Sequence, residues 1–248
     1  MTVPVLATTA PSPFTYAFAA SACGGLATRV AGADVVMRCS GALWIEDVRA
    51  LVVADLHLEK GSSYARRGQM LPPYDTRETL GRLEAEIAAT KPAVVVLLGD
   101  TFHDRTSEGR LAGDDAERLR GLASGRRLVW VIGNHDADGP QALPGEAVDE
   151  IVLGGLTLRH EPQPGAQLGE VAGHLHPAAR VVAPRGTVRR RCFVTDGERT
   201  VLPAFGAYAG GLNVLDAAFA GLFVRPPLTG ALATGRVRAI GWGRLAGD

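Results

Sequence analysis

Three apolar segments in the first half of the chain each run directly into a polar side chain, and this pattern constrains the fold more than any other feature. The segments and the residues after them are 50–54 with Asp55, 93–98 with Gly99-Asp100, and 128–132 with Gly133-Asn134-His135. Short continuous apolar runs are typical of strands buried on both faces, as in a parallel sheet. Because neighbouring parallel strands end at the same edge of a sheet, we expect these polar side chains to lie together there.

Helical patterns alternate with these strands. Residues 75–90 carry leucine and isoleucine at helical spacing, and Asp75 with Glu78 predicts a capping box at the start of this helix. Residues 115–124 predict a second helix, whereas residues 59–74 are polar and predict a loop. Strands that alternate with helices favour an α/β fold.

The second half of the chain differs, because short strands follow one another with turn residues between them. The expected strands are 151–159, 170–172, 180–183, 187–195 and 200–202. Asp196-Gly197 is a common hairpin turn, and residues 35–38 and 42–45 predict another hairpin. We therefore predict an α/β architecture of two packed sheets with helices outside, in which the second sheet is mostly antiparallel.

Composition limits the class of protein. Lys plus Arg and Asp plus Glu both number 26, so the formal net charge is zero and gives no support to nucleic-acid binding by global charge. Cys23, Cys39 and Cys192 are odd in number and widely spaced, which disfavours a disulfide framework and favours a reducing cytoplasm. No uninterrupted apolar run is long enough to span a bilayer, so no membrane association is expected.

The N-terminal residues 1–32 are rich in Ala, Thr, Ser and Pro and predict a loosely ordered extension. A signal peptide needs a basic start and an unbroken apolar core, but the first basic residue is Arg29 and three prolines interrupt the segment. Export is therefore the lesser alternative. No internal repeat or linker follows, so we expect residues 33–248 to form a single domain.

All six histidines lie in or beside short motifs of metal-binding side chains. Aspartate, asparagine and histidine supply the oxygen and imidazole donors that bind manganese, iron or zinc. A spacing of two along a strand places Asp55 and His57 on one face, and the same holds for His174 and His176. These pairs can converge on one cation, and the donors left for a second are Asp100, Asn134 and His160. The set predicts two divalent metal ions, with manganese favoured over iron or zinc.

The ordered motifs between residues 50 and 176 resemble those of the calcineurin-like metallophosphoesterases. This resemblance implies a four-layer sandwich of two mixed β-sheets flanked by helices. The implied ligands are Asp55, His57 and His176 for the first metal, Asn134, His160 and His174 for the second, and Asp100 between the two. His135 would be the acid that protonates the leaving oxygen. Arg159 departs from the pattern, since the family often has Gly before the histidine that matches His160.

A narrower resemblance is to the ligase-associated DNA damage response endonucleases of bacteria, a branch of that family. The matching segments are Ala54–Gly61, Leu71–Thr76 and Leu202–Tyr208. The resemblance implies a phosphodiesterase that cleaves DNA and works beside a DNA ligase and a helicase in repair. Residues 99–103 also resemble the second motif of double-strand-break repair nucleases, which implies a catalytic or phosphate-contacting role for His103.

Several of these side chains could have a purely structural role instead of a functional one. The candidates for contact with a nucleic-acid backbone are Arg66, Arg67, Arg189 and Arg191, but a solvated basic surface is the alternative for all of them. His103 could instead form a hydrogen bond with Asp104. Asp136 could serve to cap or orient His135.

The function has alternatives as well. The same metal centre would serve a phosphodiesterase or phosphomonoesterase that acts on a small nucleotide or a lipid-sugar phosphate. A non-catalytic binding scaffold on this fold is disfavoured, because the candidate metal ligands and His135 are all present in the sequence.

Overall fold

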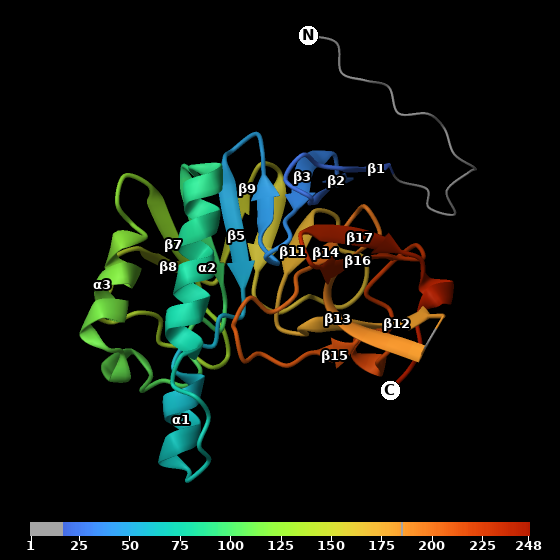
Figure 1. Cartoon of the computed structure of the whole chain (residues 1–248). Helices are drawn as coiled ribbons and strands as arrows, with labels where there is room; N and C mark the ends of the chain where they lie inside the picture. Colours follow the sequence, from blue (N-terminus) through green and yellow to red (C-terminus); the bar gives the residue numbers. More distant parts are fainter. Residues whose placement is uncertain (1–16, 185) are drawn as a thin grey trace.

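The computed structural model describes residues 17–184 and 186–248. Two mixed β-sheets pack face to face, and the α-helices lie against the outer face of the first sheet (Figure 1). This arrangement confirms the predicted α/β sandwich. None of the described helices is long and apolar enough to cross a membrane.

The first sheet has eight strands, which lie in sequence order. They are β1 (Phe18–Ala20), β2 (Leu26–Val30), β3 (Ala33–Met37), β4 (Leu43–Ile45), β5 (Ala50–Ala54), β6 (Val94–Leu98), β7 (Arg127–Val131) and β8 (Glu146–Val148). Neighbours from β1 to β5 are antiparallel, whereas neighbours from β5 to β8 are parallel. The predicted buried strands are thus confirmed as β5, β6 and β7, and so is the hairpin of β3 and β4.

Three α-helices connect the parallel strands: α1 (Lys60–Arg66), α2 (Asp75–Thr90) and α3 (Gly113–Gly121). The predicted capping box is wrong, because no side chain caps α2 and Asp75 Oδ2 instead accepts a hydrogen bond from the Gly61 amide at 3.0 Å. The prediction of a loop over residues 59–74 is wrong in part, because α1 lies within it. Its Gly-Ser-Ser sequence has low helix propensity, so contacts such as the one from Asp75 stabilise it.

The second sheet has nine strands and is mixed. They are β9 (Glu150–Leu153), β10 (Leu156–Arg159), β11 (Glu170–Ala172), β12 (Pro177–Ala183), β13 (Gly186–Thr195), β14 (Thr200–Val201), β15 (Leu212–Asn213), β16 (Leu228–Ala233) and β17 (Arg236–Ile240). The expected single strand 151–159 is a hairpin, because Gly154 and Gly155 turn the chain at positive φ angles. Five pairings are antiparallel, but β10–β11, β11–β14 and β12–β15 are parallel.

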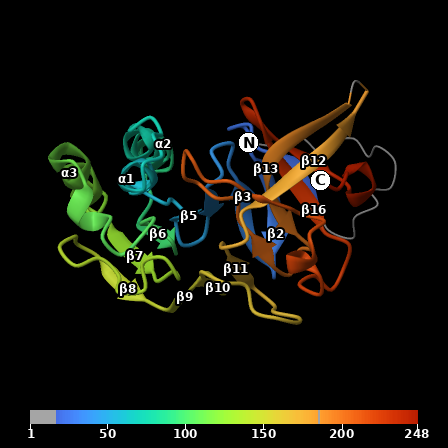
Figure 2. The same ribbon diagram turned by 90° about the horizontal axis from the view of Figure 1, so that it is seen from below.

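Alternate side chains of the central strands enter two different apolar cores. Val52 packs between the two sheets in the core that contains Phe193, whereas Leu51 packs with Leu83 of α2 on the other face. The view in Figure 2 shows the three α-helices on one side and β12, β13 and β16 on the other. The outer face of the second sheet is covered by segments that include the 3₁₀ helices Ala217–Phe219 and Trp242–Arg244. Within the described ranges, α-helices therefore flank one sheet and not both.

The predicted N-terminal extension needs a correction. Residues 1–16 lie outside the described residues, but residues 17–32 contain β1 and β2, which belong to the first sheet. Leu26 and Val30 are buried in the core between the sheets, while Ala27 and Arg29 point to the opposite, more exposed face. The domain therefore begins before residue 33, because the alternating pattern of β2 provides one apolar face to the core.

Arg199 is buried within the second sheet and its charge is paired there. Its side chain is 1% exposed and lies 2.7 Å from Glu170 Oε2. The guanidinium also donates to the carbonyl oxygens of Leu222 and Gln163, both at 2.7 Å. These bonds connect β14, β11 and the segments on either side, and they replace the water that the charge loses on burial.

We expect Arg199→Ala to lower the free energy of unfolding by about 3–5 kcal/mol, because it leaves the buried Glu170 carboxylate without its closest partner. Urea unfolding measures this. The control is Arg225→Ala, which removes a partly exposed ion pair with Glu198 and should cost about 0–1 kcal/mol. If both variants lost the same free energy of unfolding, burial of the Arg199–Glu170 pair would not explain its contribution to stability.

Candidate metal centre

The predicted ligands come from loops that meet where the two sheets adjoin. Asp55 and His57 follow β5, Asp100 follows β6, Asn134 follows β7, His160 follows β10, and His174 and His176 follow β11. Bonds tie these loops together: the His57 amide donates to Asp100 O at 2.9 Å, and the His174 amide donates to Asp55 Oδ2 at 3.0 Å. The structure thus brings all of these side chains to one place.

Asp55, His57 and His176 form the first group of donors. The Nε2 atoms of His57 and His176 are 3.1 Å apart, and His176 Nε2 lies 3.4 Å from Asp55 Oδ1. Two ligand atoms that lie about 2.1 Å from one cation, at an angle of about 90–110°, are separated by about 3.0–3.4 Å. The spacing of this group therefore suits a single cation.

Asn134, His160 and His174 form the second group. Asn134 Oδ1 lies 2.9 Å from His160 Nε2 and 3.1 Å from His174 Nδ1, and the two nitrogens are 3.1 Å apart. The three atoms form a nearly equilateral triangle. Such a triangle is one face of a tetrahedral or octahedral coordination shell.

Asp100 lies between the two groups. Its Oδ1 is 3.5 Å from His160 Nε2, and its Oδ2 is 3.9 Å from His57 Nε2. The two carboxylate oxygens therefore face different groups, as a carboxylate that bridges two cations requires.

The chemistry of these side chains suits metal binding. Burial, followed by repulsion from His176, lowers the pKa of His57 to about 2, so its imidazole is neutral and offers a lone pair. The buried Nδ1 atoms of His57 and His160 have no hydrogen-bond partner among the described residues. Imidazoles beside carboxylate and amide oxygens are a suitable donor set for manganese, iron or zinc. The residues present thus fit a pair of divalent metal ions.

The backbone at these ligands is left-handed. Asp55, His57, Asp100, His174 and His176 have φ angles of 55°, 45°, 44°, 65° and 46°. For residues with a Cβ this conformation costs about 1–3 kcal/mol each and is concentrated at functional sites. Asp55 and His57 do lie together as expected, but the expected reason, that they share one face of a strand, is wrong. β5 ends at Ala54, and the two side chains meet because the chain turns after it.

Glycines beside the ligands allow the loops to approach closely. A Cβ added at Gly133 would lie 2.2 Å from the Asp100 amide nitrogen, and one added at Gly99 would lie 2.1 Å from His160 Nδ1. Gly173 would place a Cβ 2.6 Å from Asp55 Oδ2. A residue with a side chain could stand at these three positions only if the neighbouring metal-ligand residue moved away.

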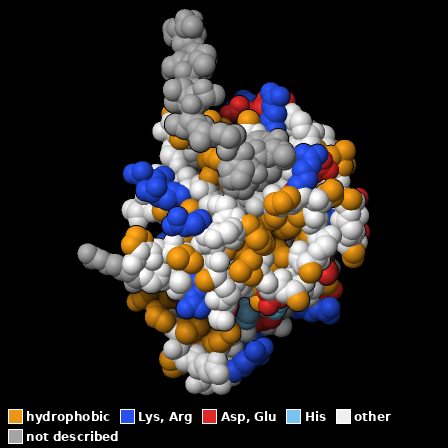
Figure 3. Space-filling view, turned by 90° about the vertical axis from the view of Figure 1, so that its right-hand side faces the viewer, with side chains coloured by type: hydrophobic (Ala, Val, Ile, Leu, Met, Phe, Trp, Pro, Cys, Tyr) orange, Lys and Arg blue, Asp and Glu red, His pale blue; other side chains and the backbone are white. Residues whose placement is uncertain are grey.

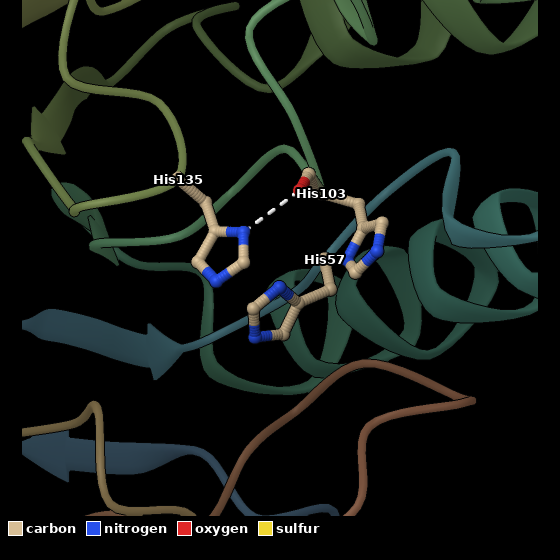
Figure 4. Close-up of side chains that lie close together, drawn as sticks. All are labelled: His57, His103 and His135. Carbon is tan, nitrogen blue, oxygen red and sulfur yellow. Dashed lines mark hydrogen bonds between the residues drawn. The ribbon is translucent and has the colours of Figure 1, made fainter. Parts of the chain in front are cut away.

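His135 and His103 lie beside the first group, and Figure 4 shows their rings with that of His57. His135 Nδ1 donates to the carbonyl oxygen of His103 at 2.8 Å, and its Nε2 lies 3.9 Å from Asp100 Oδ2. The His135 side chain is 40% exposed, so a substrate can reach it. Burial, followed by the charge of Lys60, lowers the pKa of His103 to about 4.

Asp136 joins the loops, and its carboxylate bonds to backbone amides and not to the ring of His135. Its carboxylate accepts from the amides of Gly133 and Phe102, both at 3.1 Å. Burial raises its pKa, since the amide bonds only partly replace lost water. Asp136 thus joins the loop that carries Asp100 to the loop that carries Asn134.

The four candidate arginines differ in their surroundings. Arg66 and Arg67 are exposed at the end of α1. Arg189 is exposed but is paired with Asp248 at 2.5 Å. Arg191 needs a correction, because its guanidinium is half-buried and donates to the carbonyl oxygens of Ala204, Ala207 and Ala209. Three of its five N–H groups are thus engaged by the loop behind Asp55.

Lys60 is a residue near the site to which the sequence pattern assigned no role. Its Nζ donates to the Tyr208 carbonyl oxygen at 3.1 Å and lies 5.7 Å from the centre of the Tyr64 ring. That ring is 5.8 Å from the ring of His103. Its place three residues after His57 was the available signal, but spacing alone did not show that Lys60 and Tyr64 lie beside His103.

Comparison with known families agrees with this geometry. Residues 48–189 match the calcineurin-like phosphoesterase family. The chain belongs to that family. As a calcineurin-like phosphoesterase it is a metal-dependent hydrolase of phosphoesters, and the loops described above all lie in or beside the matched region.

Two solved structures resemble this calcineurin-like phosphoesterase. The nuclease MPE of Pseudomonas putida is 32% identical, with a TM-score of 0.69 over 87% of this chain and 100% of that chain. Yfce, a phosphoesterase from E. coli, is 17% identical, with a TM-score of 0.40 over 77% of this chain and 98% of that chain. A comparison with curated proteins gives no match.

We expect Asp100→Asn to lose at least one of two bound metal ions, because an amide cannot supply two anionic oxygens to two cations. Elemental analysis after loading with manganese measures the stoichiometry. Asp138→Asn is the control, since Asp138 is an exposed carboxylate close in sequence to the centre. Full occupancy of both sites in Asp100→Asn would rule out bridging by Asp100.

Proposed function

We propose that this phosphoesterase is a two-metal phosphodiesterase that cleaves DNA. The observation that carries the proposal is the position of Asp100 between two groups of donors, with the exposed ring of His135 beside it. The likeness to a nuclease over that protein's whole length supports the choice of a nucleic acid as substrate.

In this proposal Asp55, His57 and His176 hold one cation, Asn134, His160 and His174 hold the other, and Asp100 contacts both. Two bound cations would lower the pKa of an attacking water and neutralise charge on the phosphoryl oxygens. We favour manganese among the metals that oxygen and imidazole donors bind, and the lack of cysteine disfavours a purely structural zinc site.

His135 is the proposed acid. Its Nδ1 is occupied by the bond to the His103 carbonyl oxygen, so its Nε2 is the atom that can give a proton to the leaving oxygen. His103 lies on the side of Lys60 and Tyr64, and we assign it to contact with the substrate phosphate.

The DNA backbone would be held by a local basic surface, since the net charge is zero. Arg66 and Arg67 are exposed on α1, which extends away from the sheets (Figure 1). Arg189 is a weaker contributor, because Asp248 already neutralises it. On the face in Figure 3, Lys and Arg side chains form separate groups among apolar and uncharged ones, so this face offers no continuous basic surface for a nucleic-acid backbone.

The cellular setting is part of the same proposal. We place the enzyme in the cytoplasm, where Cys23, Cys39 and Cys192 would remain free thiols, as they are in the structure. The resemblance of its motifs to the ligase-associated branch supports a role in DNA repair beside a DNA ligase and a helicase.

One observation favours the small-molecule alternative. A cavity of about 320 Å³ lies beside Asn134 and His160, and its wall includes Asp149, Glu150 and Glu161. Arg159 in the same wall pairs with Glu150, but Asp149 and Glu161 would repel a long polyanion on that side, whereas a small phosphodiester would not extend so far. A manganese-loaded enzyme that hydrolyses a bis-aryl phosphodiester but cuts no DNA would establish this alternative.

We expect Arg66→Ala/Arg67→Ala to weaken DNA cleavage, because each lost phosphate contact reduces counterion release. The slope of log affinity against log salt should fall by about two units, one for each contact. Hydrolysis of the bis-aryl phosphodiester should change much less with salt. Arg236→Ala/Arg238→Ala on the peripheral strand β17 is the control. Equal effects of the two double variants on DNA cleavage would exclude α1 as the binding surface.

We expect His135→Ala to retain both metals and to lower turnover of substrates with alkoxide leaving groups by about 10²–10⁴, the usual contribution of general acid catalysis. A nitrophenolate leaves without protonation, so turnover of a nitrophenyl ester should fall far less. Steady-state rates on a matched pair of esters measure this. An equal loss on both would mean that His135 does not donate the proton.

A further inference from the structure

Arg110 clamps the loop that follows the second ligand motif. It belongs to the 3₁₀ helix Glu108–Arg110, and its Nη1 and Nη2 atoms donate to the two oxygens of Asp104 at 2.9 and 2.8 Å. Its Nε donates to Ser62 Oγ on α1 at 2.9 Å, and Nη2 also reaches Ser107 Oγ at 2.9 Å. A bidentate guanidinium–carboxylate pair fixes both distance and orientation.

Asp104 remains ionised in this clamp. The hydrogen bond from Arg110 holds the pKa of its carboxyl group well below the usual range, and bonds from Thr106 lower it further. The expected alternative of a bond between His103 and Asp104 is therefore not what the structure shows. The Asp104 carboxylate faces Arg110.

The clamp adjoins the peptide group that holds the ring of His135. Asp104 directly follows His103, and the His103 carbonyl oxygen accepts from His135 Nδ1 at 2.8 Å. On the other side, the His103 amide donates to Leu58 O at 3.0 Å. The His103 carbonyl is thus fixed from two directions, by a main-chain bond before it and by the clamp after it.

No recorded bond in the described chain joins a carboxylate to His135 Nδ1. The nearby carboxylate of Asp136 is engaged by two backbone amides. The orientation of the ring therefore depends on a backbone carbonyl, and a carbonyl in a loop is only as fixed as the loop that carries it.

We propose that Arg110 is a positioning residue for His135: by clamping Asp104, it fixes the His103 carbonyl and so directs His135 Nε2 toward the leaving oxygen. This inference rests on the proposed acid role of His135. Release of the clamp would let the carbonyl and the ring shift together, while the metal ligands keep their own bonds. A displacement of about 1 Å can cost about 10²-fold in rate.

A double-mutant cycle tests this. We expect Arg110→Ala to lower turnover of alkoxide-leaving substrates by about tenfold or more and to spare the nitrophenyl ester. In the His135→Ala background, Arg110→Ala should have little further effect, because the group it positions is gone. Both metals should remain bound by elemental analysis.

Two further variants complete the experiment. Arg105→Ala removes an exposed arginine of the same loop, which pairs with Asp138 at 3.7 Å, and should leave both rates unchanged. Asp104→Asn keeps the shape of the side chain but weakens the clamp, and should reproduce Arg110→Ala in milder form. If Arg110→Ala does not fold, the rates of Asp104→Asn on the two esters test the inference instead.

The outcomes separate this inference from the proposed function. A loss of equal size on both esters, or the same loss with and without His135, overturns the positioning role alone. Insensitivity of His135→Ala to the leaving group overturns the acid role, and the positioning role with it.

Discussion

The close packing of metal-binding side chains at the junction of the two sheets is the constraint on which the rest of the structure depends. Imidazole nitrogens of His57 and His176 lie 3.1 Å apart, and those of His160 and His174 are equally close. Two ring nitrogens this close repel each other if both present lone pairs, and a cation or an N–H proton between them removes the repulsion. The fold must therefore hold these side chains by their backbones, through left-handed turns, close glycines and loops that bond to each other.

Hydrogen bonds between loops at this junction also couple the two sheets to each other. Asp55 follows the first sheet but accepts a hydrogen bond from His174 of the second. Behind it, the amides of Phe205 and Gly206 bond to the carbonyl oxygens of Ala54 and Asp55, and Arg191 supports the same loop. A change that loosens the sheet packing would therefore disturb the donors of the first group before it unfolds the chain.

Local patterns were sufficient to predict part of this from the sequence. The strand that ends at Asp55 and the helix that begins at Asp75 were found because their apolar patterns agree with their tertiary surroundings. α1 was missed because long-range bonds, such as that from Asp75 to Gly61, stabilise a segment with poor propensity. The roles of Arg191 and Arg110 could not be predicted, because a guanidinium in a sequence looks the same whether it faces solvent or three carbonyl oxygens.

The two flanks of the metal centre carry opposite charge, and this bears on the choice of substrate more than the net charge does. Lys60 and the exposed arginines of α1 lie on the side of His103, whereas Glu150 and Glu161 lie on the side of His160. Arg159, which stands where the family often has glycine, pairs with Glu150 at 2.7 Å and neutralises it, so Asp149 and Glu161 supply the negative charge on that side. A polyanion would therefore be attracted along α1 and repelled beyond His160, so its path over the centre has one favoured side. A net charge of zero is thus compatible with DNA as the substrate, provided that the strand enters over α1.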